Sequence, residues 1–387
     1  MRPRLPRNVI VLSWVSFFQD AASELVYPIM PLFLTGTLGA PASVVGLIEG
    51  VAEATAAIGK AVSGRLADRF RRKPMIALGY GLSSLSKPVL GLAGAWPVAL
   101  GARFFDRVGK GIRTSPRDAL IAADTPPEIR GRAFGFHRAA DTAGAIVGPL
   151  LGLALYELLD HDLRTVLFAA AVPGVISVAL IAFVRESERP AAPAPAAGVP
   201  SRHPLPRHYW RVVAVLALFA LLNFSDALLI LRAHELGLGF ASIILVYALY
   251  NTAYAALSLP AGIVSDRIPR RIVYATGLLV FAVAYTGLGL VHDAAWVWLL
   301  LPLYGAYTAL TDGVGKAWIS DLVPDTALGT GLGNFQAILG GCTLVASLWA
   351  GLAWGGDGRL PLVVSGVGVG VLAVVLLAAG RRLDAPA

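Results

Sequence analysis

Long apolar runs, each about as long as a membrane-crossing helix, repeat along the whole chain. A hydrocarbon core about 30 Å thick is crossed by about 20 residues of α-helix. Twelve runs have this length, at 9–34, 43–64, 74–94, 96–118, 132–156, 163–184, 210–231, 240–262, 272–291, 295–319, 328–352 and 360–380. They are continuous and rich in Leu, Ala and Gly, without the alternation that indicates an outer-membrane barrel. The pattern predicts an all-α polytopic membrane protein with twelve transmembrane helices.

The overall composition agrees with this assignment and excludes other classes of protein. Hydrophobic residues make up 56% of the 387 positions and charged residues 14%, whereas soluble domains carry roughly 25% charged residues. The single cysteine, Cys342, excludes a disulfide and a thiolate metal cluster. We find no phosphate-binding G-x-x-x-x-G-K-[ST] sequence, no nucleophile–base pair and no HExxH set. We therefore expect no enzyme activity, no bound metal and no cofactor.

The net charge of +8 is explained by the positions of the basic residues between the apolar runs. Cytoplasmic loops carry an excess of Lys and Arg. If the N-terminus is cytoplasmic, the inner segments hold Arg2, Arg4, Arg7, Arg69, Arg71, Arg72, Lys73, Arg117, Arg130, Arg132, Arg185, Arg189, Arg202, Arg207, Arg267, Arg270, Arg271, Arg381 and Arg382. Near the outer face only Arg164, Arg232 and Arg359 remain. We expect both termini to be cytoplasmic, and the basic excess to reflect topology rather than a nucleic-acid partner.

Two similar halves flank a Pro-rich, polar segment. We predict an N-terminal unit at 1–184, a cytoplasmic linker at 185–209 and a C-terminal unit at 210–387. DRVGK at 106–110 matches DGVGK at 312–316, and GRLADR at 64–69 matches GIVSDR at 262–267. Phe18, Asp20 and Ala21 match Phe224, Asp226 and Ala227. Such repeats predict two pseudo-symmetric six-helix bundles with a site between them near the midplane.

The segment GRLADRFRRK at 64–73 resembles the signature loop of the major facilitator superfamily. Gly64, Asp68, Arg69 and Arg72 fit that pattern, Phe70-Arg71 departs from it, and Asp266 and Arg267 belong to a weaker copy. The resemblance implies the fold of that superfamily, a gating role for these residues, and a monomer in the cytoplasmic membrane of a bacterium. The stretch at 106–119 also resembles a bacterial subgroup with largely unassigned substrates.

A second motif lies in the fifth predicted span, where Gly144, Gly148, Pro149 and Gly152 follow the spacing G-x-x-x-G-P-x-x-G. It resembles the motif of the drug/proton-antiporter-like branches of the superfamily. The alternative is ordinary packing of small residues between membrane helices.

Ionisable residues inside the predicted spans are the candidates for function, because each costs free energy in the membrane and usually faces a cavity. The first half holds Asp20, Glu24, Glu49, Glu53, Arg103, Asp106, Arg107, Lys110, His137, Arg138 and Asp141. The second half adds Asn223, Asp226, Asp312 and Lys316. As structural alternatives, we expect Asp141 to pair with Arg103 or Arg107, and Asp106 to pair with a basic residue on its own helix or the next.

Three of these carboxylates have no obvious local partner: Asp20, Glu24 and Glu53. Glu49 is expected at the outer mouth, and Asp312 with Lys316 forms an i,i+4 pair. A carboxylate in a low-dielectric cavity holds its proton more tightly than one in water. We predict that Asp20, Glu24 and Glu53 are proton or cation coupling sites with Asp141 as a partner.

A charge network of Arg103, Asp106, Arg107, Lys110, His137, Arg138 and Asp226 is expected to surround the coupling sites. Five aromatic residues either line this cavity or pack in the core and against lipid: Trp14, Phe17, Tyr27, Tyr304 and Tyr307.

These observations predict a secondary active transporter that moves a small molecule or ion across the lipid bilayer by alternating access. Proton-coupled efflux is the first hypothesis, from the motif in the fifth span. A transition-metal exporter is the second, although only six His residues are present. A lipid-handling or receptor-like membrane protein is the third. The sequence leaves the substrate open.

Overall fold

The computed structural model describes residues 5–67, 70–125, 130–185, 205–265, 267–323 and 328–378. These residues are helices and short connections, without a strand among them. The first half contains α1 (Arg7–Val26), α2 (Met30–Leu32), a π-helical turn η1 (Phe33–Thr37), α3 (Ala42–Ala67), α4 (Arg72–Gly91), α5 (Trp96–Asp124), α6 (Arg130–Leu158), α7 (Leu163–Ala169), α8 (Ala171–Leu180) and η3 (Ile181–Phe183).

The second half contains α9 (Arg207–Ala220), α10 (Asp226–Glu235), α11 (Phe240–Ser265), α12 (Arg270–Leu290), η4 (Ala294–Trp296), α13 (Val297–Asp321), α14 (Leu328–Leu352) and α15 (Arg359–Ala378). Each of the twelve predicted apolar runs is helical over most of its length. Within the described ranges, nine helical segments are both long and apolar enough to cross a membrane. The other three runs correspond to α4 and α5, which carry many polar residues, and to the divided pair α9 and α10.

The seventh predicted run, expected to be continuous over 210–231, is broken in the middle. Helix α9 ends at Ala220, and α10 begins at Asp226. Ser225 stabilises the new start because its hydroxyl accepts a hydrogen bond from the Ala227 N–H at 3.3 Å. The break puts Asp226 at the N-terminus of a helix, where the helix dipole favours a negative charge.

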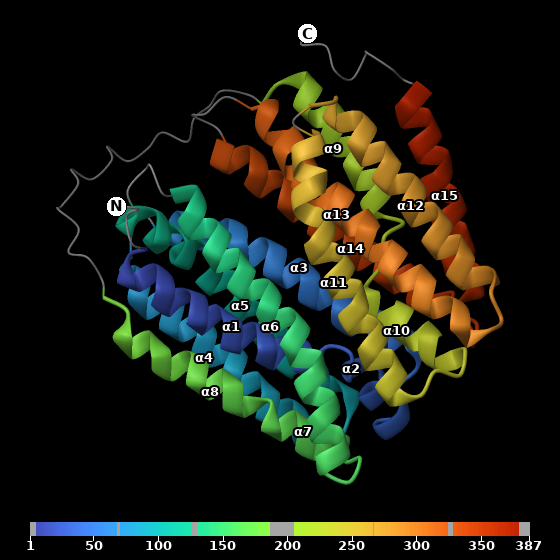
Figure 1. The fold of residues 1–387 in the computed structure, drawn as a ribbon. Coiled ribbons are helices and arrows are strands. Elements are labelled where there is room, and N and C mark those ends of the chain that lie inside the picture. The colour runs from blue at the N-terminus through green and yellow to red at the C-terminus, as the bar shows by residue number, and fades with distance from the viewer. Residues whose placement is uncertain are drawn as a thin grey trace.

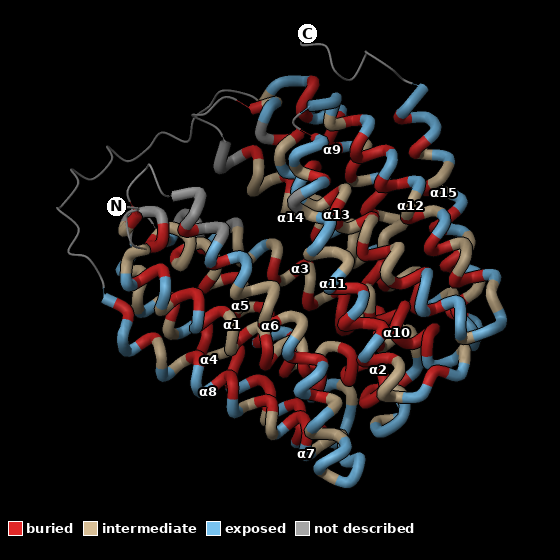
Figure 2. Tube along the Cα trace, in the orientation of Figure 1, coloured by how far each residue is buried: buried red, intermediate tan, exposed pale blue. Residues whose placement is uncertain are grey.

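The helices form two groups, α1–α8 and α9–α15, which lie side by side (Figure 1). Helix α1 begins and α15 ends on the same face of the molecule, which we call the terminal face (Figure 1). The two groups meet on the opposite face, where α2 and α3 contact α10 and α6 contacts α11, and they diverge toward the terminal face (Figure 1). Buried positions lie where helices meet, and exposed positions lie on the outward surfaces (Figure 2).

Apolar side chains such as Leu85, Val172 and Leu299 are exposed on these outward surfaces. A water-facing surface would not favour them, whereas a lipid-facing one does.

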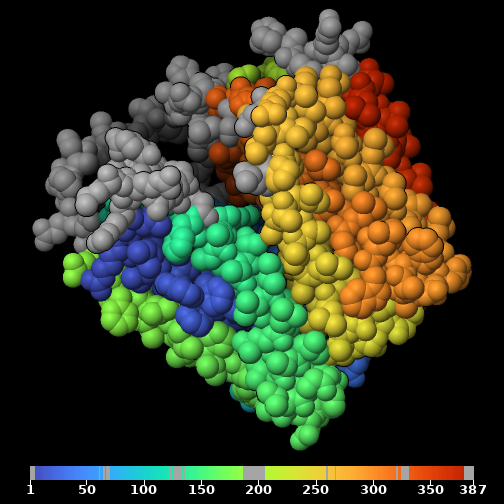
Figure 3. Space-filling view, in the orientation of Figure 1, coloured from blue at the N-terminus to red at the C-terminus, as the bar shows by residue number. Residues whose placement is uncertain are grey.

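Close approaches join the halves near the opposite face, at Gly46 and Tyr156 among other positions. A Cβ on Gly46 of α3 would lie 2.2 Å from the Ser347 carbonyl oxygen of α14, so the small residue is required. Tyr156 of α6 stacks on Phe240 at the start of α11, with ring centroids 3.8 Å apart. In the space-filling view, α6 and α11 touch along the lower part of the molecule (Figure 3).

Two of the three basic residues predicted near the outer face have structural roles there. Arg164 donates to the Gly91 and Ala93 carbonyls at the end of α4, at 3.0 and 2.8 Å. Arg232 is buried and donates to the Leu288 carbonyl in α12 at 3.0 Å. The last carbonyls of a helix have no partner within the helix, and a guanidinium satisfies them and complements the helix dipole.

Candidate functional site

A cavity of about 390 Å³ lies between α3 of the first half and the helices of the second half. Its lining combines ionisable groups, aromatic rings and small polar side chains. The lining residues include Glu53, Lys60, Phe219, Asn223, Asp226, Tyr250, Tyr274, Tyr304, Tyr307, Thr308, Thr311, Asp312, Lys316, Phe335, Gln336 and Thr343. The cavity thus combines charged groups from both halves with aromatic rings of the second half, at the position that the internal repeat predicts for a site between bundles.

Asp226 lies in this cavity because the break between α9 and α10 directs its side chain there. Its Oδ1 accepts a hydrogen bond from the Tyr304 hydroxyl at 2.6 Å, and its Oδ2 accepts one from Tyr250 at 3.2 Å. The Tyr250 and Tyr304 rings stack with centroids 5.5 Å apart, and Tyr307 lies 5.0 Å from Tyr304. Of the five aromatic candidates, Tyr304 and Tyr307 line the cavity.

The other aromatic candidates, all on the first helix and its C-terminal extension, lie elsewhere. The Trp14 side chain is 51% exposed on the outer surface, and its ring packs against Phe17. Tyr27 lies at the interface between the halves, with its ring 5.6 Å from that of Tyr247 and its hydroxyl 3.4 Å from the Ser225 hydroxyl.

Glu24 takes part in a polar contact between the two halves. The Tyr247 hydroxyl of α11 donates a hydrogen bond to Glu24 Oε2 at 2.8 Å. The sequence identified Glu24 as an intramembrane carboxylate but gave no sign of Tyr247, because the contact joins residues 223 positions apart.

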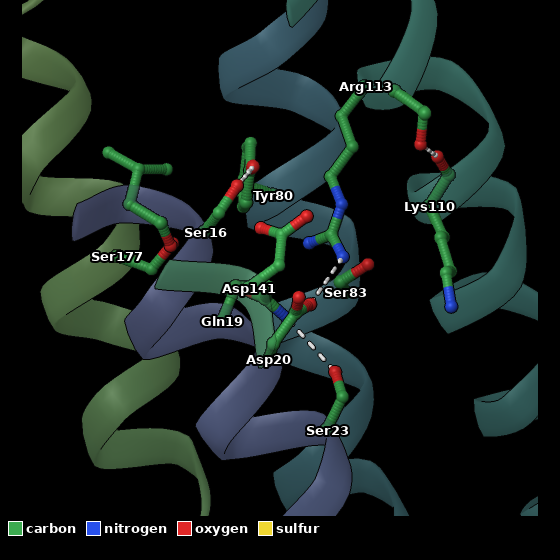
Figure 4. A network of polar contacts seen from close by, with 12 residues as sticks. Ser16, Gln19, Asp20, Ser23, Tyr80, Ser83, Lys110, Arg113, Asp141 and Ser177 are labelled. Carbon is green, nitrogen blue, oxygen red and sulfur yellow. Dashed lines mark hydrogen bonds and ion pairs between the residues drawn. The ribbon is translucent and has the colours of Figure 1, made fainter. Parts of the chain in front are cut away.

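Asp20 belongs to a separate cluster formed by α1, α5 and α6 (Figure 4). Arg113 of α5 extends to Asp20, with Nη2 and Oδ1 3.9 Å apart, and its guanidinium lies over the Tyr80 ring at 4.3 Å. Asp141 of α6 lies beside the same pair (Figure 4). The buried Nε and Nη1 of Arg113 have no hydrogen-bond partner in the described structure. The cluster therefore places one guanidinium next to two carboxylates.

The expected pairing of Asp141 with Arg103 or Arg107 is wrong. Asp141 Oδ1 lies 3.7 Å from His137 Nε2 and 4.0 Å from Arg117 Nη1. Arg117, predicted at the inner end of the run 96–118, lies within α5 and donates to the Ser16 hydroxyl at 2.9 Å.

Glu49 is also not at an aqueous mouth as expected, because its side chain is fully buried. Arg103 holds it with two hydrogen bonds, from Nε at 2.9 Å and from Nη2 at 2.8 Å. Asp106 lies 3.4 Å from Arg103 and 3.3 Å from Lys87 of α4. The expectation that Asp106 pairs with a basic residue on its own helix or the next is confirmed by Arg103, which is on the same helix. Lys87 was not identified from the sequence as part of this charge network, although a single Lys within the apolar run 74–94 is a signal of a buried ion pair.

Glu53 connects this buried chain of charges to the cavity. Its Oε1 lies 3.8 Å from Arg107 Nη2, while its side chain is 46% exposed toward the cavity that it lines. Arg107 in turn lies 3.9 Å from Asp106. Lys110 follows one turn later on α5, half-buried and within electrostatic range of Glu53 and Glu24.

A second polar connection between the halves runs from α6 to α13. Arg138 donates to the Tyr254 hydroxyl at 3.3 Å, and Tyr254 donates to Asp312 at 3.0 Å. Asp312 pairs with Lys316 at 2.7 Å, which confirms the expected i,i+4 pair.

The glycine motif of the fifth span packs within the first half. A Cβ on Gly144 would lie 2.5 Å from the Phe17 carbonyl oxygen of α1, and one on Gly148 would lie 2.6 Å from that of Ala21. Pro149 lies inside the same helix, and Gly152 lies next to Leu25. The motif therefore allows α6 to approach α1 closely.

Only part of the expected signature loop can be described. Arg72 donates to the Ala119 carbonyl of α5 at 3.0 Å, and Gly64 lies within α3. Arg267 follows the end of α11, and its N–H donates to the Val264 carbonyl. Asp68, Arg69 and Asp266 lie outside the described residues, as does most of the linker predicted at 185–209. Among the described residues, no group of three or more His, Cys, Asp or Glu is arranged to hold a metal ion.

Comparison with known proteins decides the family. The profile of the Major Facilitator Superfamily matches residues 12–231 and 212–387, which together include nearly the whole sequence. The chain belongs to the Major Facilitator Superfamily. An uncharacterised MFS-type transporter of Methanocaldococcus jannaschii is 36% identical over 357 residues, covering 90% of this chain and 89% of the relative.

Two further proteins are similar to this chain, one over part of its sequence and one in its fold. The multidrug resistance protein MdtH of Citrobacter koseri is 31% identical over 160 residues, or 41% of this chain and 39% of MdtH. The crystal structure of the nucleoside transporter NupG superposes with a TM-score of 0.80 at 13% identity, covering 97% of this chain and all of NupG. This chain is therefore a multi-pass membrane protein with the fold of an MFS transporter.

Proposed function

We propose that this protein exports a small solute across the cytoplasmic membrane of a bacterium in exchange for protons. The observation that carries the proposal is that Asp20 and Glu24, about one turn apart on α1, are not held in close salt bridges. Asp20 lies 3.9 Å from Arg113, and Glu24 accepts a hydrogen bond from a neutral tyrosine.

Carboxylates of this kind suit proton coupling because each can gain a proton without leaving a buried cation wholly unpaired. When Asp20 is protonated, Asp141 is available as a partner for Arg113 (Figure 4). When Glu53 is protonated, Arg107 keeps Asp106 as its partner. Glu49 and Asp106 are different, since each makes a short ion pair with a buried cation, Arg103 or Lys87, which protonation would break.

The direction of transport is proposed from two sources. The glycine motif resembles that of antiporters, and the similarity to a protein named for multidrug resistance favours export. The basic residues of the predicted inner loops favour a cytoplasmic position for the terminal face. The divergence of the halves toward that face then leaves the cavity accessible from the cytoplasm, with α1–α8 and α9–α15 as the units that rock during alternating access.

The test uses purified protein in liposomes and four labelled solutes of different charge: benzyltrimethylammonium, benzenesulfonate, phenylalanine and uridine. An antiporter accumulates its solute when the lumen is acidic, because outward proton flow drives inward solute flow. We expect at least one solute to accumulate under this gradient, and Asp20→Asn and Glu24→Gln each to abolish the accumulation. Glu157→Gln is the control, because Glu157 is exposed and pairs with His161 away from the cavity.

Accumulation driven instead by an alkaline lumen would show symport and contradict the proposal. If Asp20→Asn and Glu24→Gln both accumulate the solute as wild type does, these carboxylates do not take part in proton coupling.

A further inference from the structure

Asp226 is a carboxylate of the cavity that lacks a positive partner. Within the described parts of the chain, no Lys or Arg comes within 4 Å of it, and its two hydrogen bonds come from Tyr250 and Tyr304. Glu49 and Asp106, by contrast, each pair directly with a cation. Phenol hydroxyls satisfy the oxygen atoms of Asp226, and the helix terminus moderates its charge, but neither supplies a full positive charge.

Aromatic rings line the cavity next to Asp226. Tyr250, Tyr304 and Tyr307 line the cavity in consecutive ring contacts of 5.5 and 5.0 Å. The face of an aromatic ring carries partial negative charge, so it attracts cations and repels anions. The rings and the carboxylate therefore select for the same sign of charge, and the rings also offer apolar area.

The basic residues of the cavity lie toward its other end. Tyr304 and Lys316 are both on α13, and the rise of an α-helix separates them by about 18 Å along the axis. Lys316 is already paired with Asp312 at 2.7 Å. Lys60 enters from α3 two turns closer to the terminal face than Glu53. The deep end of the cavity, at Asp226, is thus the negative end.

We propose that the deep end of the cavity binds an organic cation with an aromatic or apolar body, its quaternary or protonated nitrogen placed against Asp226 and the rings of Tyr250 and Tyr304. The volume of about 390 Å³ is in the range of small-molecule sites, which run from about 300 to 1,000 Å³. This inference deepens the proposed function, since it names the substrate class of the exporter and takes the cavity as its substrate site.

The test is equilibrium binding to purified protein in detergent, without any gradient. Benzyltrimethylammonium carries a fixed positive charge, and neopentylbenzene is its neutral counterpart of the same shape. We expect the cation to bind at least about 10-fold more tightly than the neutral compound, because the rings and carboxylate act on charge. Benzenesulfonate, a fixed anion, is expected not to bind.

Variants separate the carboxylate from the rings. Asp226→Asn should weaken binding of the cation about 10-fold or more, and Tyr304→Leu should weaken it more than Tyr304→Phe, which keeps the ring. Asp226→Glu keeps the negative charge and should still bind the cation more tightly than its neutral counterpart. This variant provides the test of the carboxylate if Asp226→Asn does not fold. Glu157→Gln is the control and should bind as wild type does.

Equal binding of the cation and its neutral counterpart would overturn the inference, as would wild-type affinity in Asp226→Asn. The inference would also be overturned if phenylalanine bound more tightly than benzyltrimethylammonium and lost this binding in Lys60→Met. The site would then recognise a zwitterion through the basic end of the cavity. The outcomes are separable from those of the proposed function. Cation binding without proton-driven accumulation contradicts antiport alone, and accumulation of benzenesulfonate or uridine without cation binding contradicts this inference alone.

Discussion

Lys87 and Asp106 show what a buried charge in this protein depends on. The two groups are 3.3 Å apart, almost wholly inaccessible, and continuous with the pair of Arg103 and Glu49. Removing one partner of a buried pair leaves an unpaired charge, which costs about 3–5 kcal/mol. Asp106 keeps Arg103 at 3.4 Å if Lys87 is removed, whereas Lys87 loses its carboxylate partner if Asp106 is removed. We therefore expect Asp106→Leu to lower the free energy of unfolding by this amount, measured by thermal unfolding in detergent.

A matched pair provides the control for this prediction. Lys316→Met removes the partner of Asp312, but both side chains are partly exposed, at 48% and 38%, so we expect a loss below about 1 kcal/mol. The double variant Lys87→Met/Asp106→Leu should recover part of the stability. Equal effects of Asp106→Leu and Lys316→Met would show that the buried chain of charges is not structural.

The sequence located the charged residues but not their partners. Asp141 was expected to meet Arg103 or Arg107 and instead lies near Arg117 and His137. Spacing along one helix fixes which residues share a face, as it did for Asp312 and Lys316. A contact between helices also depends on their relative depth and rotation, which no local pattern encodes.

At the scale of helices, the contact of α6 with α1 depends on glycine. A methyl group at Gly148 would meet the Ala21 carbonyl oxygen at 2.6 Å, and backbone atoms cannot yield as a flexible side chain can. We expect Gly148→Ala to separate the helices and destabilise the protein by about 1–3 kcal/mol, the usual cost of overpacking. Thermal unfolding measures the effect.

Gly101→Ala in α5 is the control, because nothing lies within 4 Å of the added methyl group. Alanine is favoured over glycine in a helix by up to about 1 kcal/mol, so this variant should be neutral or slightly more stable. A Gly148→Ala variant as stable as Gly101→Ala would contradict the packing account of the motif.

Helix boundaries were predictable where apolar residues set them, and less so where polar groups did. The run ending at 118 extends as α5 to Asp124, because Arg113 and Arg117 find partners inside the bundle. The break before Asp226 could not be read from apolar content, since Leu221, Leu222 and Phe224 continue the hydrophobic run. A polar Asn-x-Ser-Asp sequence at 223–226 is the only local sign of it.

At the scale of the whole molecule, the internal repeat predicted a site between two bundles, and the cavity has that position. The repeat could not predict which conformation the bundles adopt. That depends on contacts between residues distant in sequence, such as Tyr156 with Phe240 and Gly46 with Ser347, which bring the halves together on the opposite face.

Alternating access requires these contacts to open, and a cross-link can prevent it. The single cysteine allows a clean design: in a Cys342→Ser background, Tyr156→Cys and Phe240→Cys place thiols on α6 and α11 where the two rings stack. A short bis-maleimide bridging them should abolish accumulation in liposomes, because the opposite face can no longer separate. Binding of benzyltrimethylammonium in detergent should persist, because the cavity is reached from the terminal face.

The single-cysteine variants treated with the same reagent control for alkylation and should keep their activity. Transport that continues after complete cross-linking would mean that the halves do not rock about this cavity, whereas loss of binding together with transport would place the route to the cavity on the opposite face.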